Sequence, residues 1–309
     1  MTDLSLVIPV LNEEGSLRIL TDKIMNVFAS ENIKGEIRFI NDGSTDQTSD
    51  ILDDLSGQYE NVKVVHFRNN KGKAAALQEG FKQAKGRYVI TMDGDLQDDP
   101  EEIPRLIAKL EEGWDMVSGW KKIRHDPLDK TLPSKLFNKT TSKLTGIPIH
   151  DFNCGLKAYR QEVVRSITLY GELHRYIPVL AKMEGFQVTE LPVTHHPRTT
   201  GKSKYGAGRM FKGFFDLITV LFLTRFTVRP MHFFGMLGLL STIIGAGVEI
   251  WVLILKYVYN EPFQMHLAML LFGILLLILG VQLFSMGLIG EMLVYQFRKN
   301  KLKPETDDE

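Results

Sequence analysis

Two long apolar segments near the carboxyl end limit what this chain can fold into. Residues 231–255 and 267–293 are almost free of charge, and their acidic residues, Glu249 and Glu291, each lie toward one end. A helix of about 20 apolar residues crosses the hydrocarbon core of a bilayer. An acidic side chain near its end can reach the headgroup region. The sequence therefore predicts a two-helix transmembrane region over residues 231–293.

The basic residues around these segments predict their orientation. Two arginines precede the first segment and four basic residues follow the second, whereas the link at 256–266 holds one lysine and one glutamate. The positive-inside rule then places both ends in the cytoplasm. The sequence opens without a basic and apolar leader, and the single cysteine, Cys154, fits a reducing compartment. We expect a multi-pass protein of the inner (plasma) membrane, with its amino-terminal domain and both termini in the cytoplasm.

The amino-terminal part has the pattern of an α/β domain. Short apolar runs alternate with amphipathic segments, at residues 4–10, 37–40, 62–67, 88–92 and 116–119. Such alternation is typical of βαβ units and a parallel sheet. Lys and Arg together equal Asp and Glu, with 37 of each, so the net charge gives no indication of a nucleic-acid partner.

An acidic cluster follows the run at residues 88–92. Asp93 and Asp95 come directly after it. Ligands of open α/β sheets bind beyond the carboxyl ends of the strands, and paired carboxylates suit a hard divalent cation. An EF-hand loop that starts at Asp93 would need glycine at its sixth position and glutamate at its twelfth. These positions hold Asp98 and Pro104, so the sequence disfavours a calcium loop. The cluster therefore predicts a cation site that could hold a diphosphate.

Polar residues also end the first two predicted strands. Asn12, Glu13 and Asp42 would reach the same edge of the sheet as Asp93 and could bind a base and a ribose. Turn and helix-cap chemistry is the alternative explanation for Asp42. Neither a dinucleotide fingerprint nor a P-loop is present, so a phosphate must meet a cation or lysines.

Four ordered motifs resemble family 2 glycosyltransferases of the GT-A fold. They are residues 8–13 (IPVLNE), 41–46 (NDGSTD), 92–97 (MDGDLQ) and 153–157 (NCGLK). With two apolar segments at the carboxyl end, the chain is similar to the polyprenyl-phosphate glycosyltransferases, which include dolichyl-phosphate mannose synthases and bacterial glucosyl-carrier enzymes. The resemblance implies a mostly parallel GT-A sheet with flanking helices, followed by interfacial amphipathic helices and two transmembrane helices.

The resemblance also implies roles for individual residues. The nucleotide sugar would be bound by Pro9, Val10, Asn12, Glu13, Asp42, Lys73 and Asp93. Asp93, Asp95 and Gln97 would hold Mg2+ or Mn2+. Asp151 matches the family's catalytic position and would orient the acceptor or support the developing charge at the sugar carbon. The expected reaction is inverting transfer of a sugar, with UDP-glucose as the first candidate donor, to undecaprenyl phosphate.

Basic residues between the predicted sheet and the membrane are candidates for binding the acceptor phosphate. They are Lys122, Arg124, Arg198, Ser203 and Lys204. Nonspecific attraction to anionic headgroups is the alternative, worth about 1 kcal/mol per residue. The first basic position after the strand at residues 116–119 is often arginine in the family. This chain has Lys121 and Lys122 there, so the sequence does not decide which side chain binds the phosphate.

The expected organisation has four parts. Residues 1–205 form the glycosyltransferase domain, 206–230 interfacial helices, 231–293 the membrane region and 294–309 a polar tail. Glycines in the apolar segments favour close helix packing, within the chain or in a homo-oligomer. A GDP-mannose-dependent mannosyltransferase and a non-enzymatic membrane scaffold are the alternatives. A processive synthase is disfavoured because its Q-x-x-R-W motif is absent.

Overall fold

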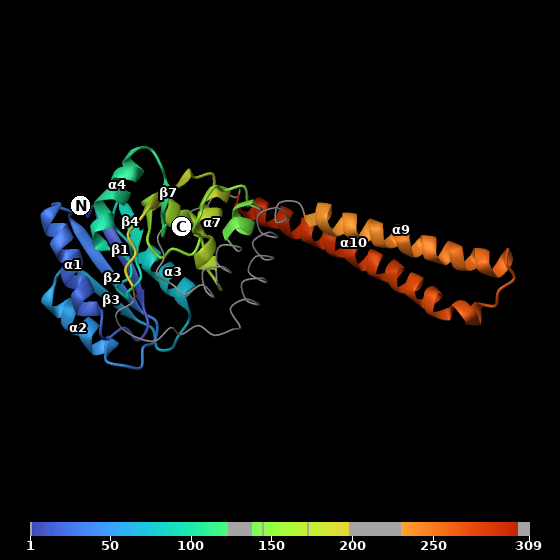
Figure 1. The fold of residues 1–309 in the computed structure, drawn as a ribbon, viewed down its shortest axis with the longest axis horizontal. Helices are drawn as coiled ribbons and strands as arrows, with labels where there is room; N and C mark the ends of the chain where they lie inside the picture. Colours follow the sequence, from blue (N-terminus) through green and yellow to red (C-terminus); the bar gives the residue numbers. More distant parts are fainter. Residues whose placement is uncertain (1, 123–137, 144, 172, 198–229, 302–309) are drawn as a thin grey trace, which may run out of the picture. The chain divides into compact units, whose positions relative to one another are not determined.

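The computed structural model describes residues 2–122, 138–143, 145–171, 173–197 and 230–301 (Figure 1). The chain divides into two compact units, residues 1–218 and 219–309. The predicted interfacial segment at 206–230 lies outside the described residues except for Pro230.

The described strands of the first unit form one sheet in the order β3-β2-β1-β4-β6-β5-β7. They are β1 (Leu4–Val10), β2 (Gly35–Asn41), β3 (Val62–His66), β4 (Tyr88–Thr91), β5 (Met116–Trp120), β6 (Lys157–Arg160) and β7 (Val188–Pro192). β6 is antiparallel to β4 and β5, and every other neighbouring pair is parallel. The predicted mostly parallel sheet is therefore confirmed.

Helices cover both faces of this sheet (Figure 1). The described helices of the first unit are α1 (Leu17–Ser30), α2 (Thr48–Gln58), α3 (Lys73–Gln83), η1 (Pro100–Glu102), α4 (Ile103–Glu111), α6 (Gln161–Ser166), η2 (Leu173–Tyr176) and α7 (Ile177–Met183). Apolar residues of α1, α2 and α4 form one core cluster, and those of α3, α6 and α7 form another. The sheet therefore lies between two helical layers.

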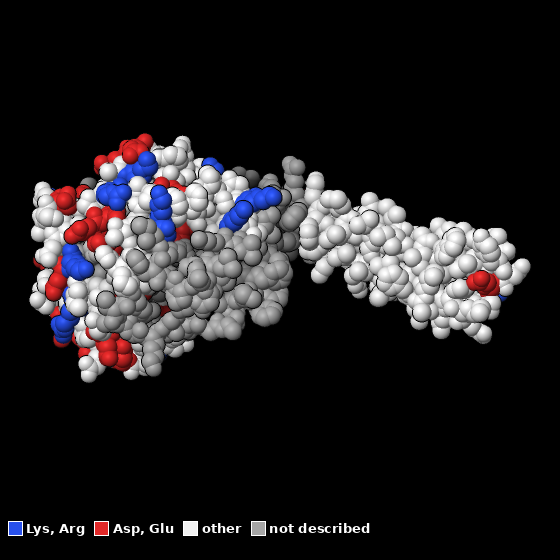
Figure 2. All heavy atoms as spheres, viewed as in Figure 1, with Lys and Arg blue, Asp and Glu red and all other residues white. Residues whose placement is uncertain are grey.

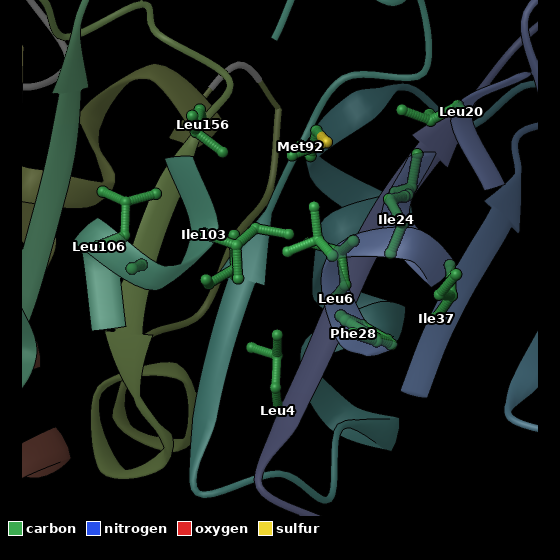
Figure 3. Packing of buried hydrophobic residues seen from close by; sticks show 14 of the residues in the cluster. Leu4, Leu6, Leu20, Ile24, Phe28, Ile37, Met92, Ile103, Leu106 and Leu156 are labelled. Atoms are coloured by element: carbon green, nitrogen blue, oxygen red, sulfur yellow. The ribbon is translucent and has the colours of Figure 1, made fainter. Parts of the chain in front are cut away.

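The alternation of side chains along β1 explains how one strand serves both cores. Leu6 and Ile8 point into the cluster with α1, whereas Val7 between them belongs to the cluster with α3. Figure 3 shows Leu6 beside Ile24 and Phe28 of α1.

The reversed strand β6 determines which residues meet at the ligand edge of the sheet. β1, β2, β4 and β5 all end at this edge, and β6 begins there because it runs the opposite way. Gly155 and Lys157 therefore lie at the same edge as the residues that follow β4. This edge holds most of the predicted site residues.

The second unit contains α9 (Pro230–Tyr257), η4 (Phe263–His266) and α10 (Leu267–Lys301). Mean hydropathies of 2.0 and 2.7 make both long helices apolar enough to cross a membrane. On the face that Figure 2 shows, these helices carry almost no charged side chains except near one end. The two predicted helices are present, and their crossing of a membrane stays a prediction.

Glycines account for the close packing of α9 against α10. A Cβ atom on Gly238 would lie 2.7 Å from the Gly280 carbonyl oxygen, and one on Gly245 would lie 2.9 Å from that of Gly273. The Ser241 hydroxyl donates to the Leu276 carbonyl oxygen at 2.8 Å. Of the two predicted uses of the glycines, packing within the chain and packing in a homo-oligomer, the structure shows the first.

Candidate nucleotide-sugar site

Asp93 lies at the centre of the ligand edge, two residues after β4. Its Oδ1 atom is 2.5 Å from the Lys73 ammonium at the start of α3. A Cβ atom on Gly155 would lie 2.4 Å from Asp93 Oδ2, so the glycine leaves the space that the carboxylate occupies. Burial acts to raise the pKa of Asp93, but the neighbouring cations, Lys73 first and then Lys121 and Lys157, together outweigh it and hold the pKa at about 2. Asp93 is therefore ionised at neutral pH.

The rest of the acidic loop is held by hydrogen bonds of its own. Asp95 Oδ1 accepts a hydrogen bond from the Gln97 backbone amide at 3.2 Å. Leu96 has a φ of 62°, in the left-handed region, which turns the chain sharply between them. The Gln97 side-chain amide donates to the His196 carbonyl oxygen at 3.4 Å.

The chemistry of Asp93, Asp95 and Gln97 fits a magnesium or manganese ion. Two carboxylates and one amide supply only oxygen donors, which hard divalent cations prefer. Within the described ranges, no group of three or more His, Cys, Asp or Glu is arranged as a metal site. That finding is compatible with a set containing a glutamine, and the metal role of these residues stays a prediction.

Lys121 points into the protein at the end of β5. Its Nζ atom is 2.9 Å from Asp98 Oδ1, and both side chains are buried or nearly so. Burial acts to lower the pKa of Lys121, but the carboxylates nearby, Asp98 first and then Asp93, contribute to an opposing effect that outweighs it and raises the pKa above its usual range. Lys122 is exposed instead, with its ammonium 5.7 Å from the centre of the Trp120 ring. Of the two lysines, Lys122 is therefore the one that solvent reaches, and its binding of an acceptor phosphate stays a prediction.

Two histidines that the sequence did not single out join the acidic loop to the segment after β7. His196 Nε2 is 2.8 Å from Asp99 Oδ2, and the His196 backbone amide donates to the Gln97 carbonyl oxygen at 2.9 Å. His195 forms an isolated bridge with Asp98. Residues 198–229, which include most of the basic segment predicted to bind the acceptor, lie outside the described residues.

Asp42 organises the loop that leads into α3. It is 4% exposed, and its two carboxylate oxygens accept hydrogen bonds from the backbone amides of Lys71 at 2.7 Å and Gly72 at 2.9 Å. These bonds place Lys73 beside Asp93. The turn-forming alternative therefore describes what Asp42 does in this structure, and its contact with a nucleoside stays a prediction.

The residues that follow β1 are held by the loop after β2. Asn12, with a φ of 51°, accepts a hydrogen bond from the Thr45 backbone amide at 2.8 Å. The Glu13 backbone amide donates to the Thr48 hydroxyl at 2.9 Å. Pro9 is half-buried, and the Val10 side chain belongs to the hydrophobic core. Val10 can therefore reach a ligand only through its backbone.

Asp151 lies beneath the surface of the loop before β6. It is 1% exposed, and its Oδ1 atom accepts a hydrogen bond from the Asn153 backbone amide at 3.1 Å. This bond shapes the turn that carries Gly155 toward Asp93. Its predicted catalytic role stays a prediction. Four predicted acceptor residues, Arg124, Arg198, Ser203 and Lys204, lie outside the described residues.

An acidic D-x-D loop at the carboxyl edge of a mostly parallel sheet, beside one reversed strand, defines a glycosyltransferase of the GT-A fold. The chain matches the model of glycosyl transferase family 2 over residues 5–168. Dodecaprenyl-phosphate galacturonate synthase from Rhizobium johnstonii is 36% identical, over 98% of this chain and 90% of that protein. The chain belongs to glycosyl transferase family 2, and within it to the polyprenyl-phosphate glycosyltransferases.

A second relative agrees with this assignment, and a solved structure shares the fold. Undecaprenyl-phosphate 4-deoxy-4-formamido-L-arabinose transferase from Pseudomonas savastanoi pv. phaseolicola is 34% identical, over 97% of this chain and 88% of that protein. Glucosyl-3-phosphoglycerate synthase from Mycobacterium tuberculosis, solved with Mn2+ and UDP-glucose, aligns with a TM-score of 0.54. The alignment covers 72% of this chain and 79% of that chain at 20% identity, and it shows the shared fold.

Proposed function

We propose that the protein transfers a sugar from a UDP-sugar to the phosphate of a polyprenyl phosphate, such as undecaprenyl phosphate. The observation that supports this most strongly is the extent of the similarity to the galacturonate synthase. It covers 98% of the chain and so includes α9 and α10, whereas the family 2 match ends at residue 168. Similarity through two apolar helices favours an acceptor that is a membrane lipid.

The proposed reaction is a single displacement at the sugar carbon. An oxygen of the lipid phosphate attacks C1, the bond from C1 to the diphosphate oxygen breaks, UDP leaves, and the anomeric configuration inverts. A phosphate monoester has a second pKa of about 6, so the attacking oxygen is already ionised at neutral pH. The enzyme then has mainly to position the reactants and stabilise the leaving diphosphate.

Lys73 and the acidic loop support the leaving-group side of this proposal. The Lys73 ammonium, held beside Asp93, places a positive charge where the diphosphate would lie. Asp93, Asp95 and Gln97 would hold Mg2+ or Mn2+. When bound, such a cation neutralises the charge that builds on a departing diphosphate.

Asp151 is proposed to position the acceptor side of the reaction, through the loop that it supports. Asp151→Ala should lower kcat by about 100-fold, because it removes the acceptor of the Asn153 backbone amide and displaces the loop, and small displacements of reacting groups cost about this much. The measurement is kcat and KM at saturating lipid. A kcat near that of the unaltered protein would refute any role for the Asp151 carboxylate.

We also propose that α9 and α10 cross the inner membrane and that the first unit lies in the cytoplasm. The lengths and hydropathies of the helices support the crossing, and the distribution of basic residues supports the orientation. On the acceptor side, Lys122 is the described residue proposed to meet the lipid phosphate.

The test is release of nucleoside diphosphate by the purified full chain, with and without undecaprenyl phosphate and Mn2+. The donors are UDP-glucose, UDP-galactose, UDP-N-acetylglucosamine and GDP-mannose. Release that requires the lipid and a UDP-sugar is expected, and preference for GDP-mannose would identify a mannosyltransferase instead. No release from any of these donors would favour a rarer sugar or the scaffold alternative.

One pair of variants tests the metal role separately. Asp95→Asn should abolish stimulation by Mn2+ and weaken Mn2+ binding, followed by the paramagnetic resonance signal of the free ion. Asp54→Asn, at an exposed carboxylate in a surface ion pair with Arg18, should change neither. Equal Mn2+ binding by both variants would exclude Asp95 as a ligand.

A further inference from the structure

An exposed histidine just before Asp151 is held in one orientation. His150 lies in the connection before β6, and 64% of its side chain is exposed. Its Nδ1 atom donates to Glu190 Oε1 of β7, and its backbone amide donates to Glu190 Oε2 at 2.7 Å. Fixing a side chain costs conformational entropy, and an exposed ring gains little from burial in return. The fixed orientation of His150 therefore points to a role at the surface.

The Trp120 ring holds His150 from a second direction. The two rings are stacked, with their centres 4.4 Å apart and their planes inclined by 17°. The Lys122 ammonium lies 5.7 Å from the centre of the same Trp120 ring. The electron-rich face of an indole favours positively charged neighbours. An imidazole and an ammonium are therefore gathered around one aromatic side chain.

The second ring nitrogen of His150 is available to a ligand. The Glu190 carboxylate occupies Nδ1, and no hydrogen bond within the described ranges occupies Nε2. A carboxylate on one imidazole nitrogen fixes the direction in which the other nitrogen points. When both nitrogens carry protons, Nε2 donates a charge-assisted hydrogen bond, which a phosphate oxygen accepts well.

The register of the sheet places this arrangement away from the residues assigned to the diphosphate. One residue from each of β4, β6, β5 and β7 lies in a row across the sheet, namely Thr91, Lys157, Ser118 and Glu190. Side chains aligned in this way point to the same face. Neighbouring strands are about 4.8 Å apart, so Glu190 lies about 14 Å across the sheet from Thr91.

The same row also holds the peptide that follows His150. The Ser118 hydroxyl donates to the Asp151 carbonyl oxygen at 3.4 Å. His150 therefore shares a face of the sheet with Asp93 but lies toward the opposite edge, beside Asp151. This position suits a contact with the acceptor rather than with the donor.

We propose that His150, oriented by Glu190 and Trp120, binds the phosphate of the polyprenyl phosphate acceptor through Nε2, with Lys122 as the neighbouring cation. The inference rests on the proposed function, which supplies the acceptor. The phosphodiester of an anionic membrane lipid offers similar oxygen atoms, so the test must distinguish the two sources.

The test separates affinity for the acceptor from affinity for the donor. The full chain in non-ionic detergent is assayed for lipid-dependent UDP release with the most active UDP-sugar. His150→Asn keeps an amide donor where Nδ1 meets Glu190 but has no counterpart of Nε2. The KM of undecaprenyl phosphate should rise about tenfold, as expected for the loss of a charged hydrogen bond. The KM of the UDP-sugar should stay within about twofold.

A second variant reverses the substitution. His150→Gln can place an amide nitrogen near the position of Nε2 but has no counterpart of Nδ1, so it should recover part of the affinity for the lipid. Better affinity in His150→Asn than in His150→Gln would overturn the inference, because it would assign the histidine to anchoring the loop on Glu190. Glu184→Gln, at an exposed carboxylate after α7, is the control and should change neither KM.

Two further measurements complete the test. Phosphatidylglycerol added to the micelles should leave the KM of undecaprenyl phosphate unchanged, and competition that disappears in His150→Asn would assign the site to membrane headgroups instead. Calorimetric titration with farnesyl phosphate needs no donor and should show about tenfold weaker binding by His150→Asn. Equal binding by both proteins would overturn the inference, whichever sugar is transferred.

The outcomes for the inference and for the proposed function differ. Lipid-dependent release with an unchanged KM for the lipid in His150→Asn would overturn the inference and leave the proposed function intact. A fall in kcat without a change in that KM would also overturn it. UDP release that does not depend on the lipid would refute the proposed function, and the inference with it.

Discussion

The missing side chain at Gly155 determines where the Asp93 carboxylate can lie. Any Cβ atom there would overlap the carboxylate, with distances of 2.4 to 2.7 Å to its three terminal atoms. Asp93 is in turn fixed by Lys73, which Asp42 places through the loop before α3. Each of these side chains is therefore fixed by contact with the next, so a change at one residue should displace the others.

Gly155→Ala should therefore displace Asp93 and lower kcat/KM by about 100-fold, because misplacement of about 1 Å costs this much. The measurement is lipid-dependent UDP release with saturating Mn2+. Gly57→Ala is the matched control, since nothing lies within 4 Å of the added atom and alanine favours a helix. Full activity of Gly155→Ala would show that the carboxylate can move without loss.

A buried ion pair far from the ligand edge makes stability depend on pH. Glu36 accepts hydrogen bonds from Arg38 at 2.8 and 2.9 Å and from the Ser5 hydroxyl at 2.5 Å. Burial acts to raise the pKa of Glu36, but these hydrogen bonds outweigh it and lower the pKa below 4.5. A lowered pKa in the folded state stabilises the fold above pH 4.5, and this contribution disappears as the pH falls through the folded value.

Glu36→Gln should lower the free energy of unfolding at pH 7 by about 3 kcal/mol, because it leaves the Arg38 charge buried without its partner. The difference from the unaltered chain should shrink below about pH 4.5. Urea denaturation of the full chain in detergent measures both effects, with exposed Glu60→Gln as the control. A difference that stays constant from pH 7 to pH 3 would contradict this account.

At the scale of whole elements, α9 and α10 pack through backbone contact rather than interlocking side chains. A Cβ atom on Gly280 would lie 2.2 Å from the Thr242 hydroxyl and 2.8 Å from the Gly238 carbonyl oxygen. Larger residues such as Ile243, Leu271 and Leu275 are exposed on the outer surfaces. The helices are thus closest where their side chains are smallest.

Gly280→Leu should separate the two helices and lower the temperature of half-unfolding in detergent by about 5 °C or more. Gly247→Leu on the outer side of α9, where nothing lies within 4 Å, should have little effect. Heating followed by measurement of the soluble fraction compares the two. Equal stability of both variants would mean that the glycine contact contributes little.

The strands predicted from sequence are those rich in branched apolar residues. β1 to β5 have this composition even though Arg38 and Lys63 interrupt β2 and β3, and the structure confirms them with small differences at their ends. β6 was missed because it is four residues long and begins and ends with a cation, and β7 because Thr189, Glu190 and Pro192 break its pattern. Both are held by pairing with β5, which no local pattern reveals.

The same distinction applies to the candidate site. Asp93, Asp95 and Gln97 were identifiable because one motif carries all three. The burial of Lys157, which ends the fourth motif, was not predictable, because a sequence does not distinguish a buried cation from an exposed one. The inward turn of Lys121 likewise depends on Asp98, which lies 23 positions earlier in the chain.

At the scale of the whole molecule, the proposed topology can be tested by thiol labelling, because the native thiol of Cys154 should contribute little signal. Cys154 is buried, and burial raises its pKa to about 12, so the unaltered chain should react slowly with thiol reagents. Tyr259→Cys places a thiol between α9 and α10, and Glu31→Cys places one on the first unit.

A membrane-impermeant maleimide applied to spheroplasts should label Tyr259→Cys and spare Glu31→Cys. Inside-out vesicles should give the reverse pattern, because the proposal places the two residues on opposite sides of the bilayer. Labelling of both residues from the same side would rule out the proposed arrangement. The unaltered chain controls for reaction at Cys154.

The reversal of β6 has a consequence for how enzymes of this shape can diverge. Because β5 ends and β6 begins at the same edge of the sheet, the connection between them starts and finishes on the ligand side, and among its described residues Cys154 and Leu156 join the core just before β6. Insertions or deletions in this stretch need not shift any strand register. We therefore expect enzymes of this fold to differ in acceptor mainly through the connection between β5 and β6, while the sheet that positions Asp93 stays the same.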